Sequence, residues 1–310
     1  TNEIVAFSGQ SGFVFMPFDA GVKLCLPTEI STFSQGNFEN LEQKSANKFT
    51  SAANQKEAFE NLVSKGIAAI QNDAFDKVVL SRKIVLNEQI SVVATFQNLI
   101  ATYPTAFRYL FFHPKIGLWM GATPEQLVKI NQNQFETVAL AGTQLFSEYI
   151  IWNTKEIEEQ QFVTDFIVSE MASKVKNLVV SETKTIKAGN LAHLKSIITG
   201  KLTGDFSALD LIMTLHPTPA VCGLPKESAL DFIQKNEAFD RTYYSGFLGE
   251  YNSNNQTDLF VNLRCLEVVN DAVNIYVGCG ITNDSNPEME FLETENKSMT
   301  MRNIIVFSGQ

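Results

Sequence analysis

The chain has 310 residues, of which 45% are hydrophobic and 19% are charged. It is longer than the ~100–200 residues of a typical domain, and its composition supplies a large core, which excludes an intrinsically disordered protein. The 24 basic and 34 acidic residues give a net charge of −10, which argues against nucleic acid or an anionic membrane surface as a partner. Without a run of ~18 apolar residues or a signal-peptide pattern, we expect neither a membrane span nor secretion.

The compositional dip along the chain is short, so we expect a single domain over residues 1–310. The cysteines stand at positions 25, 222, 265 and 279 and form no C-x-x-C pair. This scatter argues against a zinc ribbon or a disulfide scaffold and favours a reducing, cytoplasmic location. Because the chain opens with Thr1 and not Met, we expect further residues before it.

Predicted elements begin with residues 31–57, whose richness in Ser, Asn, Gln and Lys predicts a mobile surface segment. Helical hydrophobic periodicity then predicts helices over residues 56–71, 91–102, 154–177, 225–235 and 287–302. Strands are predicted over residues 77–86, 118–122, 126–130, 135–140, 244–251, 259–269 and 273–278. Several strands follow one another with short connections, which is typical of antiparallel meanders and predicts an α+β fold.

Common catalytic motifs are missing from the sequence. Gly278 and Gly280 follow a predicted strand, but Asn283 stands where a dinucleotide-binding fingerprint needs its third glycine. There is no Walker loop, H-E-x-x-H or G-x-S-x-G motif, and the histidines at 113, 193 and 216 lack metal-ligand spacing. We therefore expect the chemistry to rest on carboxylates and lysines.

The predicted helix over 154–177 carries glutamates that need an explanation. Asn153 and Glu156 have the spacing of a capping box, in which Glu156 returns a hydrogen bond to the cap. Glu159 is different, because it lies on the apolar stripe of the helix, four residues before Val163. A carboxylate on that stripe points toward the core.

The last predicted helix, over 287–302, carries a second acidic stripe. Glu290, Glu293 and Lys297 lie three and four residues apart on one face. That face can be a solvated one with an ion pair between Glu293 and Lys297. Two acidic stripes aimed at one core would repel each other, however, unless a hard cation with oxygen ligands lay between them. This combination predicts Mg²⁺ as a cofactor.

Three further charged residues stand in predicted strands or next to them. Lys77 opens the strand over 77–86, where a lysine that extends from the sheet edge to solvent is the default explanation. Glu125 follows a proline in a loop, where a carboxylate is usually solvated. Arg264 interrupts an otherwise apolar strand and therefore needs a carboxylate partner from the protein or from a ligand.

Together these segments resemble the chorismate-utilising enzymes, most closely the isochorismate synthases. The resemblance rests on DKVVLSR (76–82), GATPEQL (121–127), LAGT (140–143), KEIEEQ (155–160), LAHL (191–194), LHPTPAVCGLP (215–225), RTYYSGFLG (241–249), NLRC (262–265), VGCGI (277–281) and SNPEMEFLETENK (285–297). These motifs run in order over most of the chain. The sequence departs from the family pattern at Gln160, where His is common, and at Cys279, where Ala is frequent.

The resemblance implies one chorismate-binding domain in which two large antiparallel sheets pack together with helices outside. It also implies roles for particular residues: a general base at Lys77, a general acid at Glu125, and Mg²⁺ ligands at Glu159 and Glu293 with Glu290 close by. Implied contacts with the substrate come from Gly142, His193, Ala220, Tyr244, Arg264, Gly278, Gly280 and Lys297. The expected reaction converts chorismate to isochorismate, for menaquinone or siderophore biosynthesis, in a monomer without a glutaminase partner.

Other readings within and beyond this family remain open. Relatives that transfer an amine lack the lysine corresponding to Lys77, and one branch often has lysine at the position of Ala141. Salicylate synthases share Lys77, Glu125 and the metal residues but also eliminate pyruvate. A non-catalytic anion-binding relative is the alternative from another class, and the retention of both an acid and a base argues against it.

Overall fold

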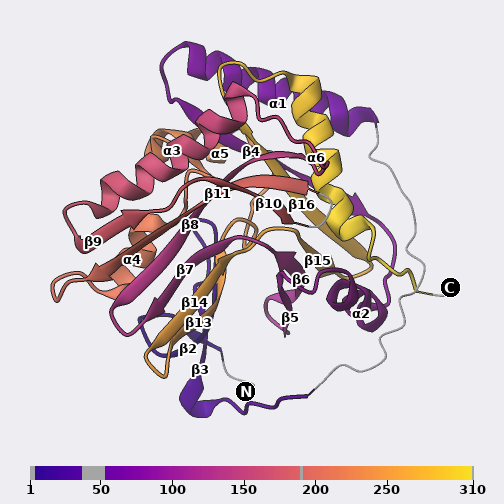
Figure 1. Ribbon diagram of the computed structural model, residues 1–310. Coiled ribbons are helices and arrows are strands. Elements are labelled where there is room, and N and C mark those ends of the chain that lie inside the picture. The colour runs from indigo at the N-terminus through magenta and orange to yellow at the C-terminus, as the bar shows by residue number, and fades with distance from the viewer. Residues whose placement is uncertain (1–3, 37–52, 189–190, 309–310) are drawn as a thin grey trace.

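Two antiparallel β-sheets face each other in the computed structural model, which describes residues 4–36, 53–188 and 191–308. Helices cover the outer faces of the sheets (Figure 1). Aromatic side chains join the two sheets: Phe15 of one sheet lies 4.8 Å from Phe111 and 6.1 Å from Trp119 of the other, measured between ring centroids. The predicted α+β class with two packed sheets is therefore confirmed.

The larger sheet contains ten strands in the order β1-β3-β2-β13-β14-β7-β8-β11-β10, and β9 also pairs with β11. Their bounds are β1 Val5–Ala6, β2 Gly12–Met16, β3 Leu24–Pro27, β7 Gln126–Asn131, β8 Gln134–Leu145, β9 Val175–Val180, β10 Lys184–Ala188, β11 Leu191–Leu202, β13 Phe247–Ser253 and β14 Gln256–Val261. The long pair β8 and β11 carries residues of the site described below.

The smaller sheet contains six strands in the order β12-β4-β16-β15-β6-β5. Their bounds are β4 Lys77–Leu86, β5 Phe107–His113, β6 Gly117–Thr123, β12 Gly223–Leu224, β15 Cys265–Val269 and β16 Ala272–Ile281. Strands β4 and β16 form its centre and pair over most of their length, with Val79 opposite Gly280 and Ser81 opposite Gly278.

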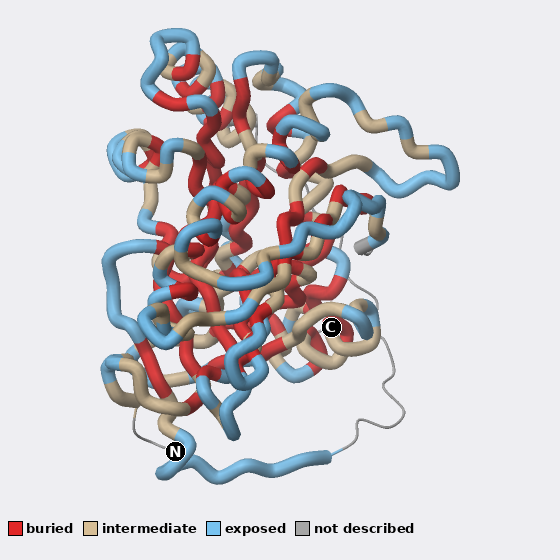
Figure 2. Tube along the Cα trace, turned by 60° about the vertical axis from the view of Figure 1, so that its left-hand side comes forward, coloured by how far each residue is buried: buried red, intermediate tan, exposed pale blue. Residues whose placement is uncertain are grey.

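Six α-helices and a short 3-10 helix occur in the described ranges: η1 Thr28–Ile30, α1 Ala53–Gln71, α2 Val92–Thr102, α3 Thr154–Met171, α4 Ala208–Leu215, α5 Lys226–Asn236 and α6 Pro287–Arg302. Helix α3 packs on β8 and β11 of the larger sheet, whereas α1 and α6 pack on the smaller sheet at β4 and β16. None of these helices is long and apolar enough to cross a membrane. Buried segments fill the interior, and exposed segments form the loops and outer helix faces (Figure 2).

The predicted strand over 259–269 is wrong, because it is two strands in different sheets. Strand β14 ends at Val261 in the larger sheet, and β15 begins at Cys265 in the smaller one. Between them Arg264 has a left-handed backbone with φ of 49°, a conformation that hydrophobic alternation does not reveal. The chain makes a second crossing of this kind between β6 and β7, at residues 124–125.

Two other expectations also need correction. The helix predicted over 154–177 ends at Met171, and the β-branched residues that follow form β9, which pairs with β11. Helix α4 is not among the predicted helices, although Ser207 and Asp210 form a capping box at its start. Of the segment predicted to be mobile, residues 31–36 are exposed and irregular, residues 53–57 belong to α1, and residues 37–52 lie outside the described part of the chain.

Candidate active site

A pocket lined by strands of both sheets brings most of the predicted site residues together. Its empty space is about 760 Å³ including the opening to solvent. The lining includes Lys77, Glu125, Gly142, Glu159, His193, Ala220, Tyr244, Arg264, Gly278, Gly280, Glu293 and Lys297. Of the predicted site residues only Glu290 is not part of this lining.

Lys77 begins β4 and has only 2% of its surface exposed. Its Nζ lies 3.8 Å from Glu159 Oε1. Burial lowers the pKa of Lys77, and the neighbouring Glu159 carboxylate offsets only part of that effect. The default explanation of a lysine that reaches solvent is therefore wrong, because this amine faces a pocket.

The neighbouring strand β16 needs glycine at two positions because other groups approach its backbone closely. A Cβ atom at Gly280 would lie 2.1 Å from Glu159 Oε1 and 3.0 Å from Lys77 Cε. A Cβ atom at Gly278 would lie 3.0 Å from the hydroxyl oxygen of Tyr244. Any larger residue at these positions would displace the groups that line the pocket.

Glu125 lies at the crossing between β6 and β7 and has 6% of its surface exposed. Burial raises the pKa of its carboxyl group from 4.5 to about 7, although Lys297, Lys77 and Arg264 act in the opposite direction. The expectation of a solvated loop carboxylate is thus wrong. Near neutral pH, part of the molecules therefore carry a proton on this side chain.

Arg264 reaches the pocket from the crossing between β14 and β15. Its guanidinium donates a hydrogen bond to Thr300 Oγ1 at 2.9 Å, and its carbonyl oxygen accepts one from the Ala122 backbone N–H at 3.0 Å. No carboxylate within the described ranges forms an ion pair with Arg264.

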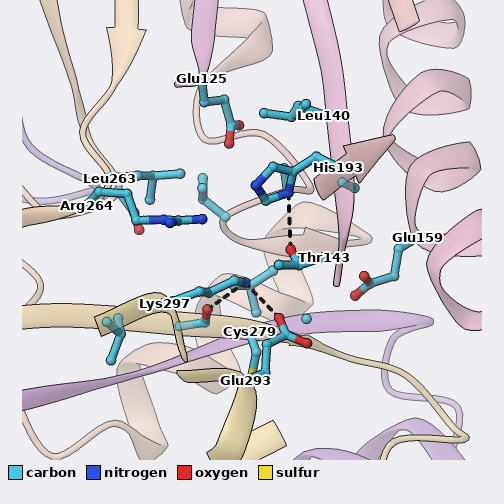
Figure 3. A pocket seen from close by; sticks show the side chains of 18 of the residues that line it. Glu125, Leu140, Thr143, Glu159, His193, Leu263, Arg264, Cys279, Glu293 and Lys297 are labelled. Atoms are coloured by element: carbon cyan, nitrogen blue, oxygen red, sulfur yellow. Dashed lines mark hydrogen bonds and ion pairs between the residues drawn. The ribbon is translucent and has the colours of Figure 1, made fainter. Parts of the chain in front are cut away.

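Lys297 reaches the same pocket from α6. Its Nζ lies 2.7 Å from Glu293 Oε1 and donates to the Gly278 carbonyl oxygen at 3.0 Å. The ion pair anticipated from the sequence is present, but it lines the pocket instead of a solvated helix face. Figure 3 shows Glu125 on the opposite side of the pocket from Lys297 and Glu293.

His193 of β11 presents an uncharged ring to the pocket. Burial, together with the positive charges of Arg264 and Lys297, lowers its pKa to about 3. Its Nδ1 lies 3.0 Å from the Gly142 carbonyl oxygen, which can only accept a hydrogen bond, so Nδ1 carries the proton. The buried Nε2 is then an acceptor, and no group in the described part of the chain bonds to it.

The three predicted metal ligands lie on two helices. Glu159 of α3 and Glu290 and Glu293 of α6 supply hard carboxylate oxygens, the kind that Mg²⁺ prefers. Glu290 is 2% exposed and pairs with Lys155, and its buried Oε2 has no hydrogen-bond partner among the described residues. Burial and the nearby Glu293 raise the pKa of Glu290, against the effect of Lys155.

These carboxylates suit Mg²⁺ in their chemistry. Glu290 Oε2 has no hydrogen-bond partner among the described residues, so it is available as a ligand atom. As they stand, no three carboxylate, His or Cys side chains of the described ranges are grouped to hold a metal. Each of the three carboxylates instead contacts a lysine. The donor atoms fit Mg²⁺ in kind, because all of them are carboxylate oxygens.

Several residues of the site are not among those predicted from the sequence. Thr143 and Leu263 line the pocket, and each is adjacent in sequence to a predicted residue. Lys155 contacts Glu290, and only its four-residue spacing from Glu159 could have indicated it. Glu156 forms the predicted capping box, since its carboxylate accepts a hydrogen bond from the Asn153 N–H at 3.0 Å.

The two positions that depart from the family pattern are both buried. Gln160 donates to Thr164 Oγ1 and to Ser196 Oγ, each at 2.9 Å. Cys279 lines the pocket, where burial raises the pKa of its thiol well above the ordinary value. Neither residue disrupts the arrangement of the lysines and carboxylates around it.

Comparison with known proteins agrees with this architecture. Isochorismate synthase EntC of Escherichia coli strain K12 is 28% identical over 93% of this chain and 79% of its own length. Isochorismate synthase DhbC of Bacillus subtilis is 29% identical over 95% and 81%. The crystal structure of DhbC from Bacillus anthracis has a TM-score of 0.80 at 28% identity and covers 94% of this chain and 83% of that one. The family described as chorismate binding enzyme matches residues 22–306, and the chain belongs to this family.

Proposed function

We propose that the protein is a magnesium-dependent isochorismate synthase, which moves a hydroxyl group from one ring carbon of chorismate to another. One observation carries this proposal: a buried lysine of lowered pKa and a buried carboxyl group with a pKa of about 7 line the same pocket. The relatives named isochorismate synthase, which match over most of the chain, support it.

In the proposed reaction Lys77 accepts a proton from water as the water oxygen bonds to a ring carbon. A lysine does this only when its amine is uncharged, and burial favours the uncharged amine. The 3.8 Å separation leaves Lys77 within reach of the Glu159 charge without a close ion pair. Burial thus favours the basic form of Lys77, and the nearby Glu159 carboxylate helps to hold its side chain in place.

Glu125 supplies the second proton transfer. As the new carbon–oxygen bond forms, the two conjugated ring double bonds each shift by one position and the original hydroxyl departs with the proton from Glu125, so that one water is consumed and one is released. A carboxyl group with a pKa of about 7 is protonated in part of the molecules at neutral pH. A solvated glutamate, with a pKa near 4.5, would be almost wholly ionised there.

The substrate is a dicarboxylate, and this acidic protein must bind it with local positive charge. Arg264 can form two parallel hydrogen bonds to one carboxylate, and Lys297 adds a positive charge to the same pocket. The acceptor Nε2 of His193 can receive a hydrogen bond from a substrate hydroxyl. When bound by Glu159, Glu290 and Glu293, Mg²⁺ would supply further positive charge for a substrate carboxylate.

Incubation with chorismate, with and without Mg²⁺, tests the proposal. We expect isochorismate in the presence of Mg²⁺, identified by mass spectrometry, with one oxygen derived from the solvent when the water is ¹⁸O-labelled. Release of salicylate and pyruvate would favour the salicylate synthase alternative. Binding of chorismate without any turnover would point to the anion-binding alternative.

A further inference from the structure

Each carboxylate of the proposed metal site contacts a different lysine. Lys77 lies 3.8 Å from Glu159, Lys297 lies 2.7 Å from Glu293, and Lys155 forms a close ion pair with Glu290. Figure 3 shows Glu159 and Glu293 turned toward the same side of the pocket. Each of the three carboxylates thus has a lysine as its counter-charge.

Two of these lysines have tasks in the proposed reaction, but Lys155 has none. It does not line the pocket, unlike Lys77 and Lys297. It lies in the first turn of α3, one helical turn before Glu159. Its side chain is 23% exposed, whereas that of its partner Glu290 is 2% exposed, so Lys155 has a path to solvent and Glu290 does not.

Lys155 places a positive charge against one of these carboxylates, because its ammonium group forms a close ion pair with the buried Glu290. Glu290 lies one helical turn before Glu293 on α6. The ammonium group therefore occupies the region beside Glu290. Lys155 would repel a divalent cation in that region strongly, because the two positive charges would be close together and little water would screen them.

We propose that Lys155 is a resident counter-cation of the carboxylate cluster, and that a divalent cation binds only by displacing it from Glu290 toward solvent. The inference rests on the proposed magnesium site and adds a competing group within this chain. Lys155 would thereby weaken the affinity for free Mg²⁺.

Metal binding without chorismate tests this directly. Mg²⁺ is titrated calorimetrically into wild type, Lys155→Gln, Lys155→Arg and the control Lys174→Gln. Lys174 pairs with Glu170 at the other end of α3, with both side chains more than a third exposed. We expect at least ~10-fold tighter Mg²⁺ binding in Lys155→Gln, because one like charge is removed, and wild-type affinity in Lys155→Arg and Lys174→Gln.

Thermal unfolding gives a second readout that does not depend on activity. Lys155→Gln should melt below wild type without metal, because Glu290 loses its counter-charge, and Mg²⁺ should reverse this difference. Lys155→Met retains the apolar stem of the side chain and should behave like Lys155→Gln. If both neutral variants fold and bind Mg²⁺ no more tightly than wild type, or if neither they nor wild type bind it, the inference is overturned.

The outcome is separable from that of the proposed function. Wild-type protein that forms isochorismate, together with neutral Lys155 variants that gain no Mg²⁺ affinity, would contradict the counter-cation and leave the proposed reaction standing. Tighter Mg²⁺ binding in Lys155→Gln, with no isochorismate formed by wild type, would support the counter-cation and contradict the reaction.

Discussion

Replacing Glu125 by glutamine should make the protein more stable than wild type at alkaline pH. The carboxyl group has a pKa of about 7 in the folded protein against 4.5 as its ordinary value. The folded state therefore holds this proton more tightly, and stability falls as the pH rises from below 4.5 to above 7. At 1.36 kcal/mol per pKa unit, the difference between 4.5 and about 7 corresponds to a loss of ~3 kcal/mol.

The Glu125→Gln variant has no proton to lose at this position and should not show this decline. Its free energy of unfolding, measured in urea between pH 4 and pH 8, should rise relative to wild type by up to ~3 kcal/mol over this interval. Glu148→Gln, at an exposed position, is the control and should follow the wild-type curve. Parallel curves for wild type and Glu125→Gln would show that Glu125 titrates normally.

The same variant tests the role of Glu125 in the reaction. The acid must be protonated, so wild-type kcat/KM should fall as the pH rises through about 7. Glu125→Gln should lose roughly 10²- to 10⁴-fold in rate, the usual contribution of a general acid, and its residual activity should lack this alkaline limb. A variant that is more stable at pH 8 and nearly inactive would connect the burial of this carboxyl group to its function.

Three other substitutions should separate the remaining roles. Lys77→Ala should lose roughly 10²- to 10⁴-fold in chorismate turnover, and near-wild-type turnover would mean that another group activates the water. Arg264→Lys keeps the charge but loses the two-pronged hydrogen-bonding geometry, so KM for chorismate should rise, and an unchanged KM would assign Arg264 to a structural role. Glu293→Gln should lose the Mg²⁺-dependent activity while its melting temperature stays at the wild-type value, and an unchanged Mg²⁺ dependence would exclude Glu293 as a ligand.

Local sequence signals located the elements whose ends are fixed by nearby residues. The predicted bounds of β4 and α6 agree with the structure, because a run rich in β-branched residues defines the first and the Asn286 cap followed by Pro287 defines the start of the second. The predicted helix over 154–177 failed at its end, where pairing of β9 with β11 takes over. Such pairing depends on residues that are distant in sequence, so a local pattern does not reveal it.

Local sequence patterns were also insufficient to predict the environment of the site residues. The resemblance to chorismate-utilising enzymes indicated the residues that line the pocket, but their local patterns indicated a solvent-exposed Lys77 and a solvated Glu125. Both residues are buried because two sheets close around them. The ion pair between Lys155 and Glu290 likewise depends on how closely α3 approaches α6, which neither helix encodes alone.

The two crossings between the sheets explain why the acid and the arginine share one pocket. Glu125 stands where the chain leaves β6 for β7, and Arg264 stands where it leaves β14 for β15. Backbone hydrogen bonds join each crossing to a strand next to the other crossing. The Val261 N–H donates to the Glu125 carbonyl oxygen at 2.9 Å, and the Ala122 N–H donates to the Arg264 carbonyl oxygen at 3.0 Å. Because backbone hydrogen bonds fix both segments, the proposed proton donor and the proposed carboxylate clamp would be positioned before any substrate enters, which is the preorganisation that efficient catalysis needs.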